Sequence, residues 1–120
     1  MSMNGTQPPA IANDRDSKLA QLCREPDWHA ALTILPSDAF TREEGRVWRH
    51  VDLARKEIHF ERILKDGTFS GGEKRLLEIA ASLFNSDHKV NLWRAFGMLD
   101  GHFTEIAIRA IRAYTQTHTA

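Results

Sequence analysis

The chain has 120 residues, and its 16 basic and 16 acidic side chains cancel to a formal net charge of zero. Hydrophobic residues make up 42% and charged residues 27% of the chain, which is typical of one globular domain and excludes a collagen-like repeat or a highly charged disordered chain. Zero net charge gives no overall attraction to nucleic acid or to an anionic membrane, so such binding would need a local patch.

The N-terminal residues predict an arm ahead of the folded domain. Residues 1–12 are mostly polar, include Pro8 and Pro9 and show no periodic apolar face, so we expect them to be mobile. The single helical domain is then predicted over residues 13–115, followed by a frayed C-terminus at 116–120.

Two short helices are predicted at the start of the domain. Apolar residues recur at helical spacing over residues 14–24, which indicates an amphipathic helix. Pro26 suits the first turn of the next helix, because its missing N–H group would have no partner there. Pro36 then ends that second helix.

The stretch that follows fits two structures. Thr41 and Glu44 have capping-box spacing, so a helix is predicted to begin there. Residues 47–60 then read either as a continued helical stripe or as a short β-hairpin that turns around residues 54–57. We favour the helix, because Ala, Arg, Lys, Glu and Leu dominate the stretch and its middle contains no Gly or Pro. Gly67 would close the element as a left-handed cap.

The last fifty residues show the clearest helical patterns. Ser70 and Glu73 form a second capping box, opening a helix that is apolar around most of its circumference and is therefore expected at the centre of the domain. A polar loop at residues 85–89 precedes a shorter helix over 90–98. A final helix over 102–114 carries one apolar stripe, formed by Phe103, Ile106, Ala107, Ala110, Ile111 and Tyr114.

These elements together predict an all-α fold. We expect a compact single-domain bundle of about five helices, with a short β-hairpin around residues 47–60 as the alternative for that stretch. The helices after Ser70 should supply a common core formed by Leu77, Ala80, Phe84, Phe96, Phe103, Ile106 and Ala110.

Residues 69–80, Phe-Ser-Gly-Gly-Glu-Lys-Arg-Leu-Leu-Glu-Ile-Ala, resemble the signature motif of ATP-binding-cassette ATPases. In that family a Ser-Gly-Gly turn at a helix N-terminus contacts nucleotide phosphate. The chain lacks a Gly-x-x-x-x-Gly-Lys-Ser/Thr loop and an apolar strand ending in an Asp-Glu pair, and it is too short for a nucleotide-binding domain. The capping box accounts for Ser70 and Glu73 without a ligand, so no nucleotide cofactor is predicted.

Residues 47–114 also resemble a segment of short bacterial helical proteins. The shared pattern is Ser-x-Gly-Glu, then Leu-Leu-x-Ile-Ala-Ala-Ser-Leu, then Leu-Asp before a final helix. Ser70–Glu73, Leu76–Leu83 and Leu99-Asp100 match it in this chain. The resemblance implies a compact bacterial domain, and it brings no activity, cofactor or site residue with it.

No residue pattern indicates catalysis or metal binding. None of the six histidines lies four residues from another, the spacing that places two imidazoles on one helix face. Glu43 and Glu44 are adjacent, so they would not face each other as an acid–base pair must. The single cysteine, Cys23, lies in a helical pattern, where a thiol usually acts as a small buried hydrophobe. We therefore predict that the protein is not an enzyme and holds no metal or cofactor.

The cysteine count and the absence of targeting patterns indicate a compartment. One cysteine permits no intramolecular disulfide, whereas small secreted domains usually contain several. Residues 1–9 show no signal-peptide pattern, and no segment approaches the ~20 apolar residues of a spanning helix. We expect a cytoplasmic protein that does not contact the membrane.

The preferred function is that of a non-catalytic regulatory or adaptor protein that binds another protein or a second copy of itself as a homodimer. Basic residues between Thr41 and Asp66 alternate with acidic ones, as on a solvated face, whereas a nucleic-acid groove would separate the two signs. Ile108 is the candidate contact residue, because it lies about 130° from the centre of the apolar stripe on the final helix.

The alternative is a DNA-binding helix-turn-helix built from the helices over 90–98 and 102–114. The polar side of the second helix would present Thr104, Arg109 and Arg112 to a groove. Glu105 would repel phosphate, and two arginines are few for such a surface. Nucleic acid is therefore the less favoured partner.

Overall fold

The chain forms a mostly helical structure, as the hydrophobic periodicity predicts. The computed structural model describes residues 10–66 and 68–119. These residues form seven α-helices, one 3-10 helix and one antiparallel pair of strands, so the prediction of an all-α domain is confirmed. In chain order the elements are α1 (Ala10–Leu22), α2 (Pro26–Ile34), η1 (Asp38–Glu43), α3 (Glu44–Trp48), β2 (Val51–Asp52), β3 (Glu57–Ile58), α4 (Phe60–Asp66), α5 (Gly71–Phe84), α6 (Leu92–Gly97) and α7 (Gly101–Thr119).

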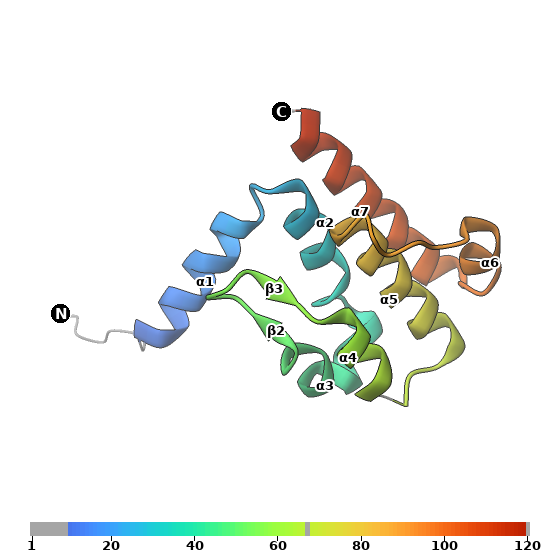
Figure 1. Cartoon of the computed structure of the whole chain (residues 1–120), viewed down its shortest axis with the longest axis horizontal. Coiled ribbons are helices and arrows are strands. Elements are labelled where there is room, and N and C mark those ends of the chain that lie inside the picture. Colours follow the sequence, from blue (N-terminus) through green and yellow to red (C-terminus); the bar gives the residue numbers. More distant parts are fainter. Residues whose placement is uncertain (1–9, 67, 120) are drawn as a thin grey trace.

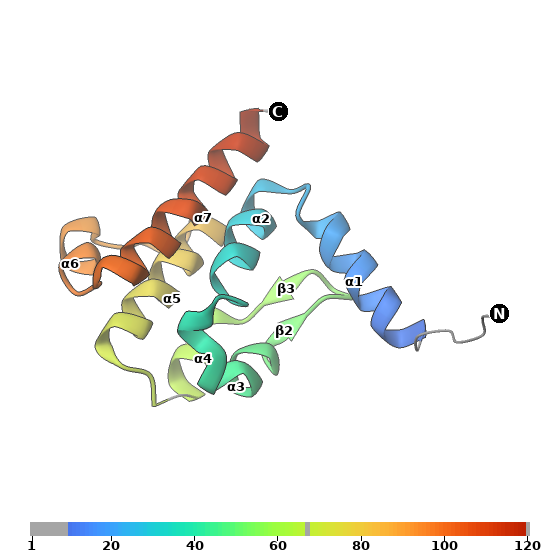
Figure 2. The same ribbon diagram turned by 180° about the vertical axis from the view of Figure 1, so that it is seen from behind.

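Helices α2, α5 and α7 form the centre of the molecule. They pack against one another, with α1 projecting on one side and α6 at the opposite end (Figures 1 and 2). The Trp28 ring of α2 meets the Phe84 ring of α5 edge to face, with centroids 5.1 Å apart. Of the predicted core residues, Leu77, Ala80, Ile106 and Ala110 are fully buried, whereas Phe84, Phe96 and Phe103 pack against the core while half-buried.

Local hydrogen bonds set where α5 begins. The Ser70 hydroxyl accepts a bond from the Glu73 backbone N–H at 3.2 Å, and the Glu73 carboxylate accepts one from the Ser70 N–H at 2.8 Å. The predicted capping box is therefore confirmed. Each of the two bonds satisfies a backbone donor that the first turn of a helix leaves without a partner.

The preferred helix over residues 47–60 is wrong, and the β-hairpin is the observed structure. Val51 pairs with Ile58 and Asp52 with Glu57 in an antiparallel register. On one continuous helix Ile63 would lie about 160° from Val47, so one of the two would face solvent. The hairpin reverses the chain between α3 and α4, and both side chains are buried.

Side-chain and backbone geometry support the turn of the hairpin. The Asp52 carboxylate accepts a hydrogen bond from the Arg55 backbone N–H at 3.0 Å, an interaction that favours a turn over a helix. Lys56 has a φ of 58°, in the left-handed region. Gly67, the predicted left-handed cap, lies outside the described residues.

Both ends of the helical domain differ from the prediction. Helix α1 begins at Ala10, inside the predicted arm over 1–12, and residues 1–9 lie outside the described residues. At the other end α7 continues to Thr119, beyond residue 116 where the predicted frayed end begins. A hydrogen bond of 2.5 Å between His29 Nδ1 and Thr117 Oγ1 ties this last part of α7 to α2.

Ile111 does not belong to the buried stripe of α7. It is exposed, whereas Ala107 and Ala110 are fully buried. Ile111 lies about 100° around the helix from Ala110, at the edge of the face that packs on α2 and α5. Within the described residues, no helix is both long and apolar enough to cross a membrane.

Candidate functional site

Helix α6 leaves two large apolar side chains in solvent. The exposed fraction is 89% for Trp93, 59% for Leu92 and 48% for Met98, which follows the helix. The buried residue of α6 is Ala95, and Trp93 lies about 160° from it around the helix. One side of α6 therefore rests on the domain, and the other presents a tryptophan outward.

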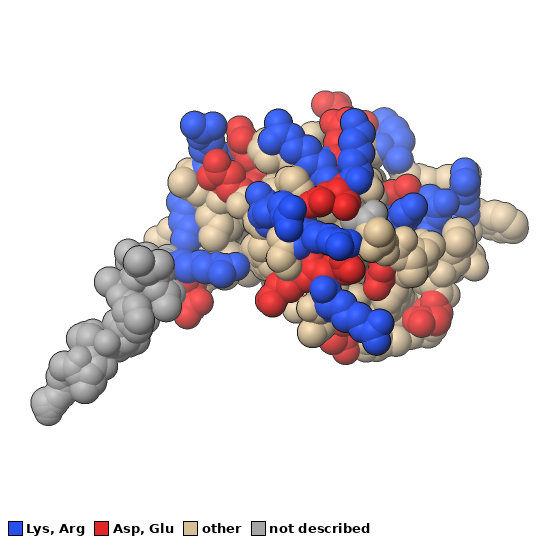
Figure 3. Space-filling view, turned by 90° about the horizontal axis from the view of Figure 1, so that it is seen from below, with Lys and Arg blue, Asp and Glu red and all other residues tan. Residues whose placement is uncertain are grey.

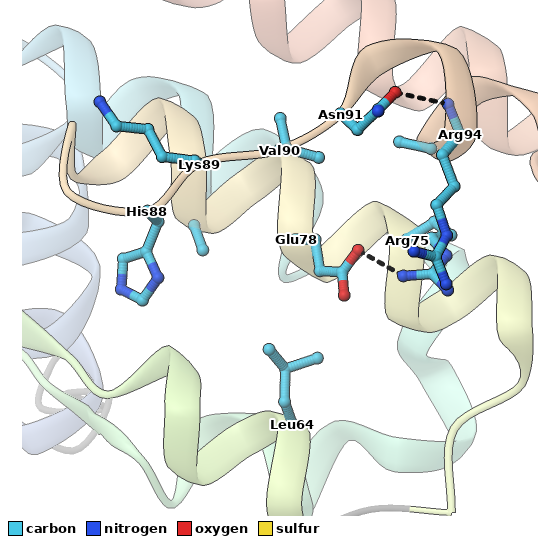
Figure 4. Close-up of a pocket in the computed structure, with 10 residues that line it drawn as sticks. Leu64, Arg75, Glu78, His88, Lys89, Val90, Asn91 and Arg94 are labelled. Atoms are coloured by element: carbon cyan, nitrogen blue, oxygen red, sulfur yellow. Dashed lines mark hydrogen bonds and ion pairs between the residues drawn. The ribbon is translucent and has the colours of Figure 1, made fainter.

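A pocket of about 350 Å³ opens beside α6 (Figure 4). Leu64 of α4 lines it from one side, Arg75 and Glu78 of α5 from another, and Arg94 of α6 from a third. The cap of α6 forms its edge, where the Asn91 side-chain oxygen accepts a hydrogen bond from the Arg94 N–H at 3.0 Å. Arg94, the residue after Trp93 on α6, therefore connects the pocket to the exposed side of this helix.

Positive charge exceeds negative charge in this pocket. Arg75 donates to Glu78 at 2.7 Å, and Glu78 is the one carboxylate that lines the pocket. The Arg94 side chain points toward Arg75 (Figure 4). Among residues 10–66 and 68–119, the Arg94 guanidinium has neither a hydrogen-bond nor an ion-pair partner. Arg94 is therefore available to bind an acidic group of another molecule.

The sequence around α6 also separates the two charge signs. Residues 88–99 contain Lys89 and Arg94 and no Asp or Glu. Elsewhere the signs are mixed: blue and red groups alternate over most of the face in Figure 3, and uncharged side chains form the right-hand end, where α6 lies in Figure 1. Residues 88–99 are thus a short basic and apolar stretch between Asp87 and Asp100.

Two glycines at the start of α5 bring α6 close to the core. A Cβ atom added at Gly71 would lie 2.8 Å from Met98 Cε, and one at Gly72 would lie 3.4 Å both from the Met98 carbonyl oxygen and from the Phe103 ring. The Ser-Gly-Gly turn that resembles the ATPase signature motif therefore packs against the corner between α6 and α7. Met98 also accepts a hydrogen bond from Arg75 Nε at 3.4 Å, which connects the apolar surface to the pocket.

The residues predicted from sequence lie on α7. Ile108 is half-buried and lies about 160° around α7 from the fully buried Ala110. Arg109 and Arg112 are exposed and line one shallow hollow, whereas Thr104 is half-buried. Thr104 lies about 140° around the helix from Arg109 and about 80° from Arg112, so the three proposed DNA-binding residues spread over a wide arc of α7.

Leu92, Trp93, Arg94 and Met98 were not predicted as site residues. The sequence patterns place Leu92 and Trp93 on a helix without showing which side is covered. One sequence signal could have pointed to this region, namely the absence of acidic residues from 88–99.

Two titratable groups outside this site have altered pKa values. The hydrogen bond from His50, 2.9 Å from Asp66 Oδ2, together with the charge of Arg49, lowers the pKa of the Asp66 carboxyl. Burial raises the pKa of the Cys23 thiol, which reduces the thiolate available for nucleophilic attack at neutral pH. No cluster of three His, Cys, Asp or Glu side chains suited to a metal occurs among the described residues.

Comparison with known proteins leaves the site to be interpreted from its own residues. No protein-family model, curated protein or solved structure matches the chain. The resemblance of residues 47–114 to short bacterial helical proteins accordingly stays a prediction.

Proposed function

We propose that the chain is a non-catalytic regulatory or adaptor protein that binds another protein through α6. The observation that carries this proposal is the 89% exposure of Trp93. A tryptophan in water leaves a large apolar area hydrated, and burying it against a partner is a frequent source of binding energy. Leu92 and Met98, on and just after the same helix, are also exposed.

The chemistry of the adjoining pocket supports binding over catalysis. No hydroxyl or thiol side chain lines this pocket, and its one carboxylate, Glu78, is paired with Arg75. Lys89 points away from Glu78 (Figure 4). A surplus arginine beside an exposed tryptophan is a typical composition for a protein-binding surface.

Site-specific photocrosslinking in the native host tests the proposal. A photoreactive aromatic residue at position 93, which keeps a large apolar ring there, should form one discrete protein adduct, and the same residue at position 105, exposed on α7, should not. The captured protein must then bind the purified wild-type chain and lose binding to Trp93→Ala. A third position, 108, tests the surface predicted from sequence. Adducts at 108 without adducts at 93 would assign the interface to α7 instead of α6.

The DNA-binding alternative has one supporting observation, the exposure of both Arg109 and Arg112 on the same hollow. Gel-shift titration of the Arg109→Glu, Arg112→Glu double mutant with random genomic fragments tests it. Under our proposal the wild type binds these fragments weakly, and the mutant behaves in the same way. Tight binding that weakens steeply between about 50 and 200 mM salt and disappears in the mutant would establish the alternative.

A further inference from the structure

We infer that α6 and the pocket beside it bind an acidic protein segment that also carries a bulky apolar side chain. This inference rests on the proposed function and specifies the chemistry of the partner. The segment would place a carboxylate at Arg94 and its apolar side chain against Trp93, the preceding residue of α6.

The charge balance of the pocket favours an acidic partner. Arg75 and Arg94 both line the pocket, and Glu78 is the one carboxylate that offsets them. Glu78 already accepts a bond from Arg75 at 2.7 Å. A second carboxylate at Arg94 would reduce the repulsion between the two guanidinium groups and would match the planar fork of donors that arginine presents.

The short length of α6 limits how far apart the carboxylate and the apolar side chain of the partner can lie. Met98, which is 48% exposed, contacts Arg75 through its sulfur, with Arg75 Nε 3.4 Å from Sδ, so one exposed apolar side chain lies beside the pocket. Helix α6 has six residues and is about 9 Å long. A carboxylate and a large apolar side chain within one or two helical turns of the same segment can therefore engage both features together.

Other occupants fit this surface less well. A nucleic acid would need more phosphate contacts than Arg75, Lys89 and Arg94 can make, and Glu78 opposes it. The same small number of cations would bind anionic lipid weakly, and α6 is short for an interfacial helix. A second copy related by a two-fold axis through α6 would bring Arg94 close to its own equivalent, which repels.

Peptide selection on the full chain tests the inference. Random twelve-residue peptides displayed on phage are panned against the immobilised wild-type protein, and the enriched peptides are synthesised with a fluorophore for anisotropy titration. We expect enrichment of sequences in which Asp or Glu lies within about four positions of Trp, Phe or Leu. Their affinity should fall about tenfold or more in Arg94→Glu and in Trp93→Ala.

Matched variants separate a specific contact from an effect of net charge. Arg112→Glu makes the same charge change on an exposed residue of α7, and it should alter the affinity by less than about twofold. Arg94→Lys should retain part of the binding, because lysine keeps the charge and loses the forked geometry. Circular dichroism and urea denaturation check that each variant folds like the wild type.

The outcomes distinguish this inference from the proposed function. Enriched peptides without acidic residues, or peptides that bind Arg94→Glu as well as wild type, would overturn the acidic partner, while loss of their binding in Trp93→Ala would keep α6 as the interface. Failure of any peptide to enrich would also overturn the inference, and the crosslinks at position 93 would then decide the proposed function separately.

Three further probes test the other occupants. They are phosphatidylserine vesicles, random DNA and RNA oligonucleotides, and sedimentation of the protein alone. Tighter binding to vesicles or to oligonucleotides than to any acidic peptide would overturn the inference in favour of lipid or nucleic acid. Self-association that disappears in Trp93→Ala would overturn it in favour of a second copy of the chain.

Discussion

The α2–α5–α7 core and α6 use the same kinds of side chain in opposite ways. Trp28 of α2 is 1% exposed and packs edge to face on Phe84, whereas Trp93 of α6 is 89% exposed. The core helices have neighbours on more than one side, and α6 has its main contacts with α5. Burial of a large apolar side chain stabilises a fold by about 1.5–3 kcal/mol, a contribution that Trp93 does not make. Its surface becomes useful when a partner covers it.

Replacing the two tryptophans gives the largest expected difference. Trp28→Ala should lower the free energy of unfolding by about 3–5 kcal/mol, because it removes a buried ring and leaves a cavity. Trp93→Ala should change it by less than about 0.5 kcal/mol. Urea denaturation followed by circular dichroism measures both values. Similar losses in the two variants would mean that α6 is part of the stabilising core, and the comparison would fail.

Phe103 sharpens the boundary between the two regions. Its half-buried ring lies 3.4 Å from the position that a Cβ atom at Gly72 would take, beside the start of α5. Phe103→Ala should lower the free energy of unfolding by about 2 kcal/mol, less than full burial would give. Ile111→Ala, on the exposed edge of the same helix, is the control and should cost less than about 0.5 kcal/mol. Equal losses of stability in the two variants would mean that Phe103 does not belong to the core.

Substitution of Ser70 tests whether the start of α5 only stabilises the helix or also binds nucleotide. Ser70→Ala should cost about 1 kcal/mol, because the Glu73 N–H loses the oxygen that accepts its hydrogen bond. Ser86→Ala, in the exposed loop after α5, should cost less than about 0.5 kcal/mol. ATP should leave the melting temperature of the wild type unchanged in a thermal-shift assay. A rise with ATP that Ser70→Ala abolishes would show that the turn binds nucleotide.

Asp66, at the end of α4, gives the smallest effect and lies outside both regions. The pKa of its carboxyl lies below the usual value of 3.8, so the folded state favours the ionised form of this group. The resulting stabilisation is present above that value and is lost as the pH falls through the folded-state pKa. The stability difference between wild type and Asp66→Asn should therefore shrink below about pH 4.

Denaturation midpoints measured from neutral pH down to about pH 3 show whether that difference shrinks. Asp87→Asn is the control, since Asp87 is exposed and its side chain has no ion pair among the described residues. A difference for Asp66→Asn that stays constant over the whole range would mean that His50 does not stabilise the carboxylate.

The candidate site shows where sequence reasoning stops. The patterns placed a short helix over residues 90–98 and grouped its apolar residues, and they identified Ile108 as the exposed apolar residue of interest. The structure leaves Ile108 half-buried and Trp93 exposed. Periodicity shows which residues share a face of a helix, and it carries no information about whether another element covers that face.

The sequence by itself determined the features that depend on neighbours within about four residues. The capping box at Ser70 and the apolar repeats of α5 and α7 are of this kind, because their hydrogen bonds and faces are set by helical geometry. The tertiary structure decided the hairpin between α3 and α4, since burying both Val47 and Ile63 requires the chain to reverse. It also decided the exposure of Trp93, because burial depends on contacts between residues far apart in the chain.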